Sequence, residues 1–349
     1  MLGILYAALG AFTFSLNNVM MRRGVVTGSV LQGMALTVPI GALSFVVMTV
    51  AFGQLGELAV FSTVAMAWLA GQGVVHFVMG RYCNYKSNQL MGVNLAAPVV
   101  QLQVPFAMLL AVVTLHETFT VLQAIGSALM LGGSFTTQSK AGKGREKDSA
   151  PQPAAPIPTV PSHTEPAPQP SPKPTFQPRV VSGYIFGLAA ATCYGSSPLM
   201  ARQAFLHAPG TGAVAGGCIA YAAATLVFSL VLLNPRSWGD IKAMKPENMP
   251  WFLSAAVLVA ISQAFVYASL AIAPLMVVTP ILQLSLVFRL FLSQWINRDH
   301  EVMNTAVFVA AGTAVLGSIL VSLPTDGLSA VLSLPPSIAD ILRHRLAGQ

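Results

Sequence analysis

The sequence contains very little charge. Only 8% of its 349 residues are Asp, Glu, Lys or Arg, whereas 54% are hydrophobic and the mean hydropathy is +0.69. A soluble domain of this size needs far more charged surface to cover such an apolar interior. The composition therefore excludes a soluble globular protein and predicts an integral membrane protein.

Signatures of enzymes, metal sites and disulfide frameworks are also missing. Cys83, Cys193 and Cys218 show no CxxC or Cys/His spacing, so their pattern indicates neither disulfides nor a metal site. The sequence has no GxSxG, no HExxH, no phosphate-binding glycine loop and no paired carboxylates at catalytic spacing. We predict a protein that is not an enzyme and uses no metal or cofactor. The net charge of +7 comes mostly from short connections beside apolar runs, which favours membrane orientation over nucleic-acid binding.

Apolar runs of about 20 residues, enough to cross about 30 Å of hydrocarbon, recur along the whole chain. Ten can be marked, at residues 2–21, 30–53, 62–85, 90–114, 119–137, 183–201, 212–234, 250–272, 275–296 and 303–322. We therefore predict an all-α polytopic membrane protein with ten transmembrane helices. The first run has no basic segment before it and no small-residue cleavage site, so we interpret it as a retained span rather than a signal peptide.

Residues 138–180 differ sharply in composition from the rest of the chain. A basic patch, KAGKGREKD, precedes a segment with a proline at nearly every second or third position. Such a segment cannot bury apolar surface, so it predicts a disordered, polyproline-like linker. The linker separates residues 1–137 from residues 181–322. In the tail, residues 323–349, the sequence SIADILRHRLAGQ predicts a short amphipathic helix at the membrane surface.

The parts before and after this linker match one another. A shift of 182 residues pairs Tyr85 with Tyr267 and Gln101 with Gln283. Each part holds five predicted spans, and because five is odd, the second part must enter the membrane from the opposite side. Inverted repeats of this kind build transporters whose site lies near the membrane midplane and opens to each side in turn.

Several segments recur in a fixed order along the two parts. They are YKSN and YASLA at the ends of the third and eighth spans, the proline-bearing fourth and ninth spans, and the turns LHETFTVLQAIGSALMLGG and NRDHEVMNTAVFVAAGTAVLG. Together they resemble the EamA-type transporters of the drug/metabolite transporter superfamily over the whole chain outside the linker and tail. The resemblance implies a solute transporter of the bacterial inner, or cytoplasmic, membrane. The long linker departs from the short connection usual in that family.

Polar side chains within the predicted spans are the candidate substrate-binding groups. At membrane depth such groups are costly and usually face a cavity or a neighbouring helix. The ionisable ones are basic or imidazole groups, and none is a carboxylate. The candidates are Asn17, Asn18, His76, Arg81, Tyr85, Asn94, Gln101, Tyr194, Ser197, Tyr267, Gln283 and Arg289. Helix packing, and for the arginines snorkelling to the interface, are the alternatives.

A cavity with cationic and amide groups but no carboxylate favours anionic, zwitterionic or carboxylate-bearing solutes. We predict a secondary transporter that exports such a small metabolite by alternating access, with the solute and the lipid bilayer as its partners. One alternative is a transport-inactive scaffold or receptor that binds a partner through the Pro-rich linker. Another is a flippase for a lipid-linked headgroup. Deleting residues 141–178 separates the first two, because transport survives the deletion only if the linker is not the functional part.

The basic residues also predict an orientation. Most Lys and Arg in the connections fall on the same side as the linker, so the positive-inside rule places the linker in the cytoplasm and both termini outside. The family resemblance implies the reverse, with both termini in the cytoplasm. We expect a phosphatase that works only in the periplasm to be active when fused after Gln349. Fluorescence from a protein that folds only in the cytoplasm, fused at the same position, would show that the charges mislead.

Overall fold

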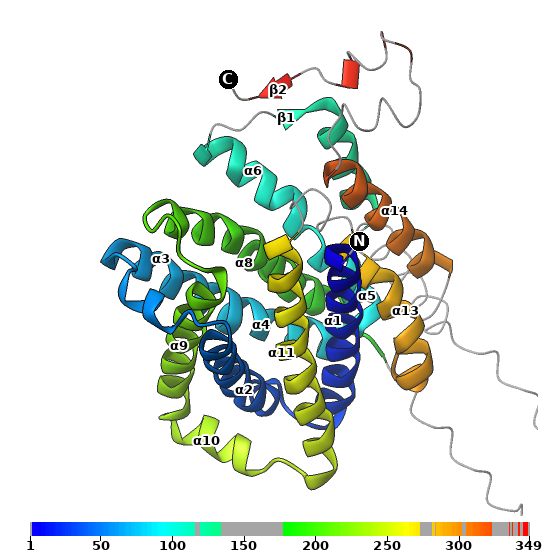
Figure 1. Ribbon diagram of the computed structural model, residues 1–349. Helices are drawn as coiled ribbons and strands as arrows, with labels where there is room; N and C mark the ends of the chain where they lie inside the picture. The colour runs from blue at the N-terminus through cyan, green and yellow to red at the C-terminus, as the bar shows by residue number, and fades with distance from the viewer. Residues whose placement is uncertain are drawn as a thin grey trace, which may run out of the picture.

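Nearly all of the described chain is helical (Figure 1). The computed structural model describes residues 2–115, 119–133, 177–272, 281–282, 284–301 and 305–322, together with 335, 337, 341–342 and 345–347. The predicted linker lies outside these ranges, apart from residues 177–180.

The elements before the linker follow the first five apolar runs. They are α1 (Leu2–Thr27), α2 (Val30–Ala51), the 3-10 helix η1 (Leu55–Ala59), α3 (Thr63–Gly73), the π-helix η2 (Val74–Gly80), α4 (Arg81–Met91), α5 (Val93–Val100), α6 (Gln103–Leu115), the short strand β1 (Phe119–Thr120) and the helix Val121–Gly133.

The elements after the linker follow the other five runs. They are α8 (Val180–Leu206), α9 (Ala213–Leu232), α10 (Pro235–Lys242), η3 (Pro246–Asn248), α11 (Met249–Ile272), α13 (Leu284–Ile296), η4 (Arg298–His300), α14 (Thr305–Ser322) and the strand β2 (Arg345–Ala347).

The described residues include six stretches that are long and apolar enough to cross a membrane. These are Leu2–Thr27, Val30–Ala51, Thr63–Met91, Val93–Thr114, Ala213–Leu232 and Pro246–Val266. Shorter apolar helices, Val121–Gly133, Leu284–Ile296 and Val307–Gly317, fall in three further predicted runs. A polytopic α-helical membrane protein is therefore confirmed. The count of ten spans and their division into two inverted repeats stay predictions.

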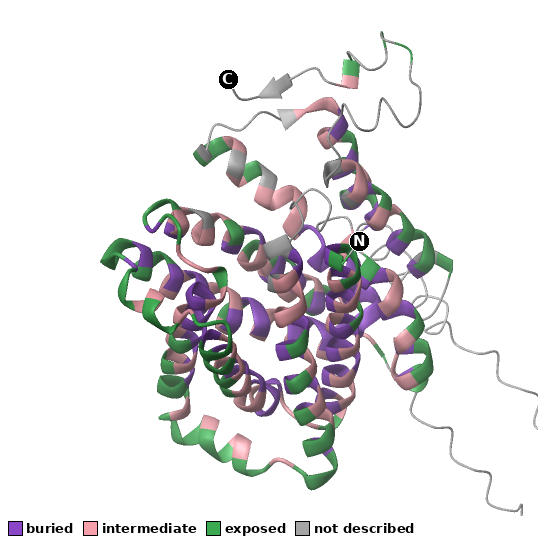
Figure 2. Cartoon of the chain, viewed as in Figure 1, coloured by how far each residue is buried: buried purple, intermediate pink, exposed green. Residues whose placement is uncertain are grey.

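Many large apolar side chains are exposed, and Figure 2 shows exposed residues along the outer helices of the protein. Trp295 is 84% exposed and Leu233 is 75% exposed, whereas Asn18, Asn84 and Asn88 are buried. A bilayer requires this distribution, because lipid-facing side chains must be apolar and polar groups must find partners inside the protein.

Aromatic packing fixes the third predicted span against its neighbours. The ring of Phe77, on η2, stacks on Tyr221 of α9 with centroids 3.7 Å apart, and Tyr221 stacks in turn on Phe45 of α2. All three rings are buried in the main apolar cluster of the protein. The middle of the third span therefore has a fixed position, which matters because η2 carries His76.

A glycine lets the third predicted span pack closely against α9. A Cβ added at Gly73, where α3 meets η2, would overlap the backbone carbonyl of Ala220 on α9. Because that backbone cannot move independently of its helix, we expect Gly73→Ala to lower the free energy of unfolding by about 1–3 kcal/mol. Gly239→Ala, in α10, is the control, since nothing lies within 4 Å of its added Cβ. Unfolding titrations in mixed micelles test the pair, and equal stability of the two variants would contradict the packing described here.

The fourth predicted span is broken twice. Gly92 separates α4 from α5 with a φ of +85°, a conformation that favours glycine. Residues 101–102 then form a turn between α5 and α6, three residues after Pro98, which lies inside α5. The break leaves Gln101 in the turn and Gln103 at the start of α6, where the sequence places prolines and amides together.

A two-stranded antiparallel pair departs from the all-α prediction. Phe119 of β1 pairs with Ala347 of β2, and Thr120 pairs with Arg345. The predicted amphipathic helix of the tail lies largely outside the described residues, although residues 341–342 are helical. The helix does not extend to Arg345–Ala347, because the backbone of these residues pairs with β1 instead.

Candidate functional site

A cavity of about 310 Å³ lies where the middles of several helices meet. Its walls come from α1, η2, α5, α6, α8, α11 and α13 and from residues beside the α5–α6 and α13 boundaries. The lining includes four residues predicted for the site, His76, Gln101, Tyr194 and Arg289. It also includes polar residues that were not singled out from the sequence, Gln103, Ser262, Gln263 and Ser285.

Arg289 gives the cavity its charge. The residue is 4% exposed, and its guanidinium carbon lies 5.7 Å from the centre of the Phe14 ring. Its Nε has no hydrogen-bond partner among the described residues, and the described residues that line the cavity include no carboxylate. A buried guanidinium that forms no direct ion pair among the described residues is costly. The arrangement therefore favours an anion in the cavity.

Aromatic rings form another part of the wall. The His76 and Tyr194 rings have centroids 4.7 Å apart, and both residues line the cavity with Phe14. A shift of 180 residues along the sequence pairs Phe14 with Tyr194. Rings beside a few polar groups are typical of small-molecule sites, in which apolar surface provides contact area and polar groups fix orientation.

His76 is held by a hydrogen-bonded set on its own span and on α8. Its Nδ1 lies 3.0 Å from Oγ of Ser197, and Nε2 of Gln72 donates to that same Oγ at 2.9 Å. Ser197, another predicted site residue, is 3% exposed and is not part of the cavity lining. Ser197 therefore contacts His76, a cavity residue, without lining the cavity itself.

Arg81 lies outside the cavity lining. Its Nη1 donates to the carbonyl of Thr37 at 3.2 Å and its Nη2 donates to the hydroxyl of Tyr221 at 2.9 Å. The guanidinium also lies over the Phe77 ring, at 5.2 Å from the ring centre. These contacts join the third span to α2 and α9, so the observed role of Arg81 is to hold helices together.

Three predicted asparagines also lie outside the cavity lining, and two of them make hydrogen bonds between helices. Oδ1 of Asn18 accepts hydrogen bonds from Asn84 and Asn88, each at 3.1 Å, which ties α1 to α4. Asn17 is buried on α1. Asn94, at the start of α5, accepts a hydrogen bond from Oγ of Ser293 at 2.6 Å.

Of the three remaining candidates, the structure describes the side chain of Tyr85 only. Tyr85 is 1% exposed and belongs to the main apolar cluster. Tyr267 lies on α11, but its side chain is outside the description, and Gln283 is outside the described residues altogether. The proposed repeat partners of Tyr85 and Gln101 therefore stay predictions.

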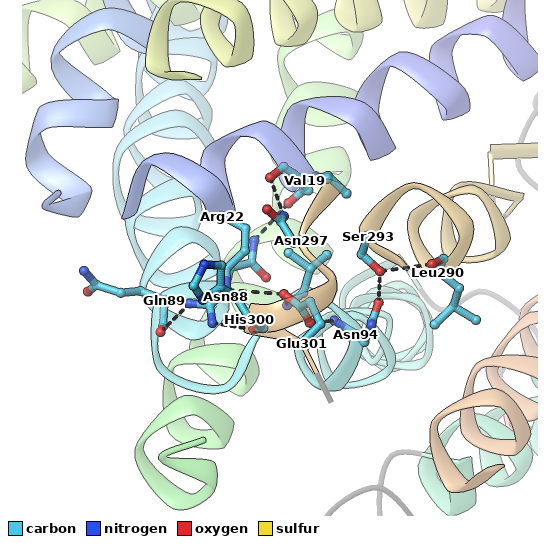
Figure 3. A network of polar contacts seen from close by, with 12 residues as sticks. Val19, Arg22, Asn88, Gln89, Asn94, Leu290, Ser293, Asn297, His300 and Glu301 are labelled. Carbon is cyan, nitrogen blue, oxygen red and sulfur yellow. Dashed lines mark hydrogen bonds and ion pairs between the residues drawn. The ribbon is translucent and has the colours of Figure 1, made fainter. Parts of the chain in front are cut away.

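A second polar cluster lies near the C-terminal end of α1 (Figure 3). Nε of Arg22 pairs with Oε1 of Glu301 at 3.2 Å, and both side chains are almost fully buried, at 1% and 0% exposure. The guanidinium also donates to the carbonyls of Gln89 and His300, each at 2.8 Å. We call Arg22, Gln89, Val93, Asn94, His300 and Glu301 the Arg22–Glu301 cluster.

Glu301 also caps the start of α5. Its Oε1 accepts from the backbone N–H of Val93 at 2.8 Å and its Oε2 accepts from that of Asn94 at 3.1 Å. A Cβ at Gly92 would lie 2.6 Å from Oε2, so glycine is needed there for space as well as for its backbone angle. The carboxylate thus joins α1, the α4–α5 turn and the segment after α13.

Burial changes the acid–base behaviour of this cluster. It raises the pKa of the Glu301 carboxyl, while Arg22 and the N–H groups of Val93 and Asn94 act in the opposite sense. Burial also lowers the pKa of His300, and the neighbouring Arg23 and Arg22 lower it further. The cluster therefore depends on its mutual contacts to keep charge inside the protein.

Sequence reasoning missed the Arg22–Glu301 cluster because it placed Arg22 and Glu301 in loops or at helix ends. One available signal was the His-Glu dipeptide, which occurs at His116-Glu117 and again at His300-Glu301, in the turns that the two parts share. A polar pair repeated at matching turns is a reason to expect a structural role at both.

Comparison with known proteins agrees with the predicted resemblance for the part of the chain before the linker. Residues 1–138 match the EamA-like transporter family. No curated protein matches the chain. A solved structure, described only as the crystal structure of a protein, is 15% identical, with a TM-score of 0.47 and coverage of 94% of this chain and 99% of that one. A similarity this low carries no conclusion about function.

Proposed function

We propose that this multi-pass membrane protein, whose residues 1–138 match the EamA-like transporter family, is a secondary transporter of small anionic or carboxylate-bearing solutes. The solute binds in the cavity beside Arg289. The family match supports a membrane transporter of the drug/metabolite transporter superfamily, and the chemistry of the cavity supports the solute class.

The observation that carries this proposal is the guanidinium of Arg289, buried at the cavity with Nε unpartnered among the described residues. A guanidinium presents its donors in a planar fork that fits the two oxygens of a carboxylate. A bound carboxylate would supply the missing counter-charge. A lipophilic cation in the same place would add like charge at low dielectric.

The size of the cavity supports a small solute. At about 310 Å³ it lies near the lower end of the range for ligand sites, about 300–1,000 Å³. Amides from Gln101, Gln103 and Gln263 provide both donors and acceptors. Zwitterionic metabolites fit this pattern too, because an amide oxygen can accept from an ammonium group while Arg289 binds the carboxylate.

Alternating access between two inverted repeats is the proposed mechanism, and export across a bacterial inner membrane is the proposed direction. The internal match between the two parts of the sequence supports the mechanism. The position of the cavity supports it as well, since Phe14 and Tyr194 lie near the middles of α1 and α8. The direction rests on the family resemblance.

A flux assay with three solute classes tests the proposal. Purified protein is reconstituted in vesicles loaded with a mixture of small carboxylates, neutral amides and organic cations, and efflux is followed by mass spectrometry. We expect carboxylates to leave faster than from protein-free vesicles, with little movement of cations. Selective efflux of the cations, or no protein-dependent efflux in any class, would overturn the proposal.

A further inference from the structure

The backbone at His76 has an unusual form. Residues 74–80 form the π-helix η2 inside an otherwise α-helical span. Turns of this kind interrupt α-helices rarely and frequently occur at functional sites, because they change which side chains share a face. Here the turn carries His76 into the cavity wall, while Phe77 packs against Tyr221 on the other side.

The hydrogen bonds around Ser197 bear on which nitrogen of His76 carries a proton. Gln72 uses an N–H to donate to Oγ of Ser197, so it occupies one acceptor position of that oxygen. The hydroxyl proton of Ser197 remains available. Nδ1 of His76, at 3.0 Å, is the partner that the described structure offers it.

A proton donated by Ser197 requires Nδ1 to act as an acceptor. The imidazole is then neutral and carries its own N–H on Nε2. Nε2 has no hydrogen-bond partner among the described residues, and His76 lines the cavity. The ring therefore has an unused donor at the surface that would meet a solute.

We propose that Gln72 and Ser197 position His76 in its Nε2–H tautomer, so that the cavity presents an imidazole donor in addition to the Arg289 guanidinium. A carboxylate in the cavity is then bound by both groups. This inference rests on the proposed function for its solute, whereas the tautomer itself is a property of the empty protein. Gln72 and Ser197 are positioning residues, since neither lines the cavity.

Nuclear magnetic resonance of protein labelled with ¹⁵N-histidine in lipid bilayers tests the tautomer directly. The His76 signal is assigned by its loss in His76→Asn. We expect a single Nε2–H tautomer in the wild type and a mixture of tautomers in Ser197→Ala. Ser197→Thr, which keeps the hydroxyl, should restore the wild-type spectrum. Ser196→Ala is the matched control, because that neighbouring hydroxyl donates to Thr192 and Cys193 backbone carbonyls instead.

Binding of acetate, the probe for a carboxylate, gives the second readout. Acetate should shift the His76 Nε2 resonance of the wild type, whereas its neutral isostere acetamide should not. Loss of one positioned hydrogen bond should weaken acetate binding by about 2–10-fold in Ser197→Ala, with no loss in Ser196→Ala.

The tautomer measurement and the acetate measurement test different parts of the proposal. An Nδ1–H tautomer in the wild type, or a Ser197→Ala spectrum identical to the wild-type spectrum, overturns the positioning. The wild-type measurement decides this even if Ser197→Ala does not fold. An Nε2–H tautomer that does not respond to acetate overturns the proposed carboxylate site and leaves the positioning intact.

Discussion

Replacing Glu301 with alanine is expected to lower the free energy of unfolding by about 3–5 kcal/mol, the usual cost of removing one partner from a buried ion pair. The change would remove the carboxylate that pairs with the buried Arg22 guanidinium. It would also remove the acceptor for the backbone N–H groups of Val93 and Asn94. Denaturant titration of the purified protein in mixed micelles measures the difference.

A neighbouring acid on the same segment provides the control for this prediction. Asp299 lies two residues before Glu301 and is exposed, so Asp299→Ala should change the stability little. Adding Arg22→Met to Glu301→Ala should recover part of the loss, because it removes the buried charge with which Glu301 was paired. Equal stability of the Glu301→Ala and Asp299→Ala variants would show that the buried pair does not hold these helices together.

Replacing Arg289 with glutamine is expected to reduce carboxylate transport about tenfold or more. Glutamine keeps a hydrogen-bonding group in the cavity but removes the charge, and hydrogen bonds to charged groups contribute about 1.5–3 kcal/mol. Removing a cation that has no carboxylate beside it among the described lining residues should not lower the amount of inserted protein. Initial rates of efflux from vesicles with matched protein content measure the effect.

Arg298→Gln is the matched control for Arg289→Gln. The two arginines are nine residues apart, and Arg298 is exposed on η4. Its replacement should leave the initial rate near the wild-type value. If Arg289→Gln transports carboxylates as fast as the wild type does, the charge of the cavity does not select the solute.

Part of the cavity lining could be predicted from the sequence. The position of a residue within an apolar run indicates its depth in the membrane. His76, Gln101, Tyr194 and Arg289 are polar or ionisable groups near the middle of apolar runs, and all four line it. The apolar pattern does not say which neighbour a polar group will meet. Arg81 is also an ionisable group within an apolar run, yet its donors are used by Thr37 and Tyr221.

Irregular backbone is a second reason why the sequence did not predict the whole site. Asn94 and Gln101 lie at opposite ends of the short helix α5, which the break at Gly92 and the turn at residues 101–102 delimit. Asn94 contacts Ser293 and the Arg22–Glu301 cluster, whereas Gln101 lines the cavity. Apolar periodicity likewise contains no signal for the π-helix that carries His76.

The Arg22–Glu301 cluster is formed by tertiary contacts, so local sequence patterns did not predict it. A glutamate in a short connection is normally solvated, and nothing in its local sequence predicts burial. Glu301 is buried because η4 brings it against Gly92, whose missing side chain leaves room for the carboxylate. A contact between residues more than two hundred positions apart is outside the reach of local patterns.

Access to the cavity from both sides of the membrane is the most direct test of a transporter that works by alternating access. Ser285, a buried cavity residue on α13, is replaced by cysteine after Cys83, Cys193 and Cys218 are changed to alanine. A thiol reagent that cannot cross membranes is then applied from either side to oriented vesicles. We predict labelling of this cysteine from both sides, at different rates. Labelling from one side alone, however long the exposure, would contradict the account.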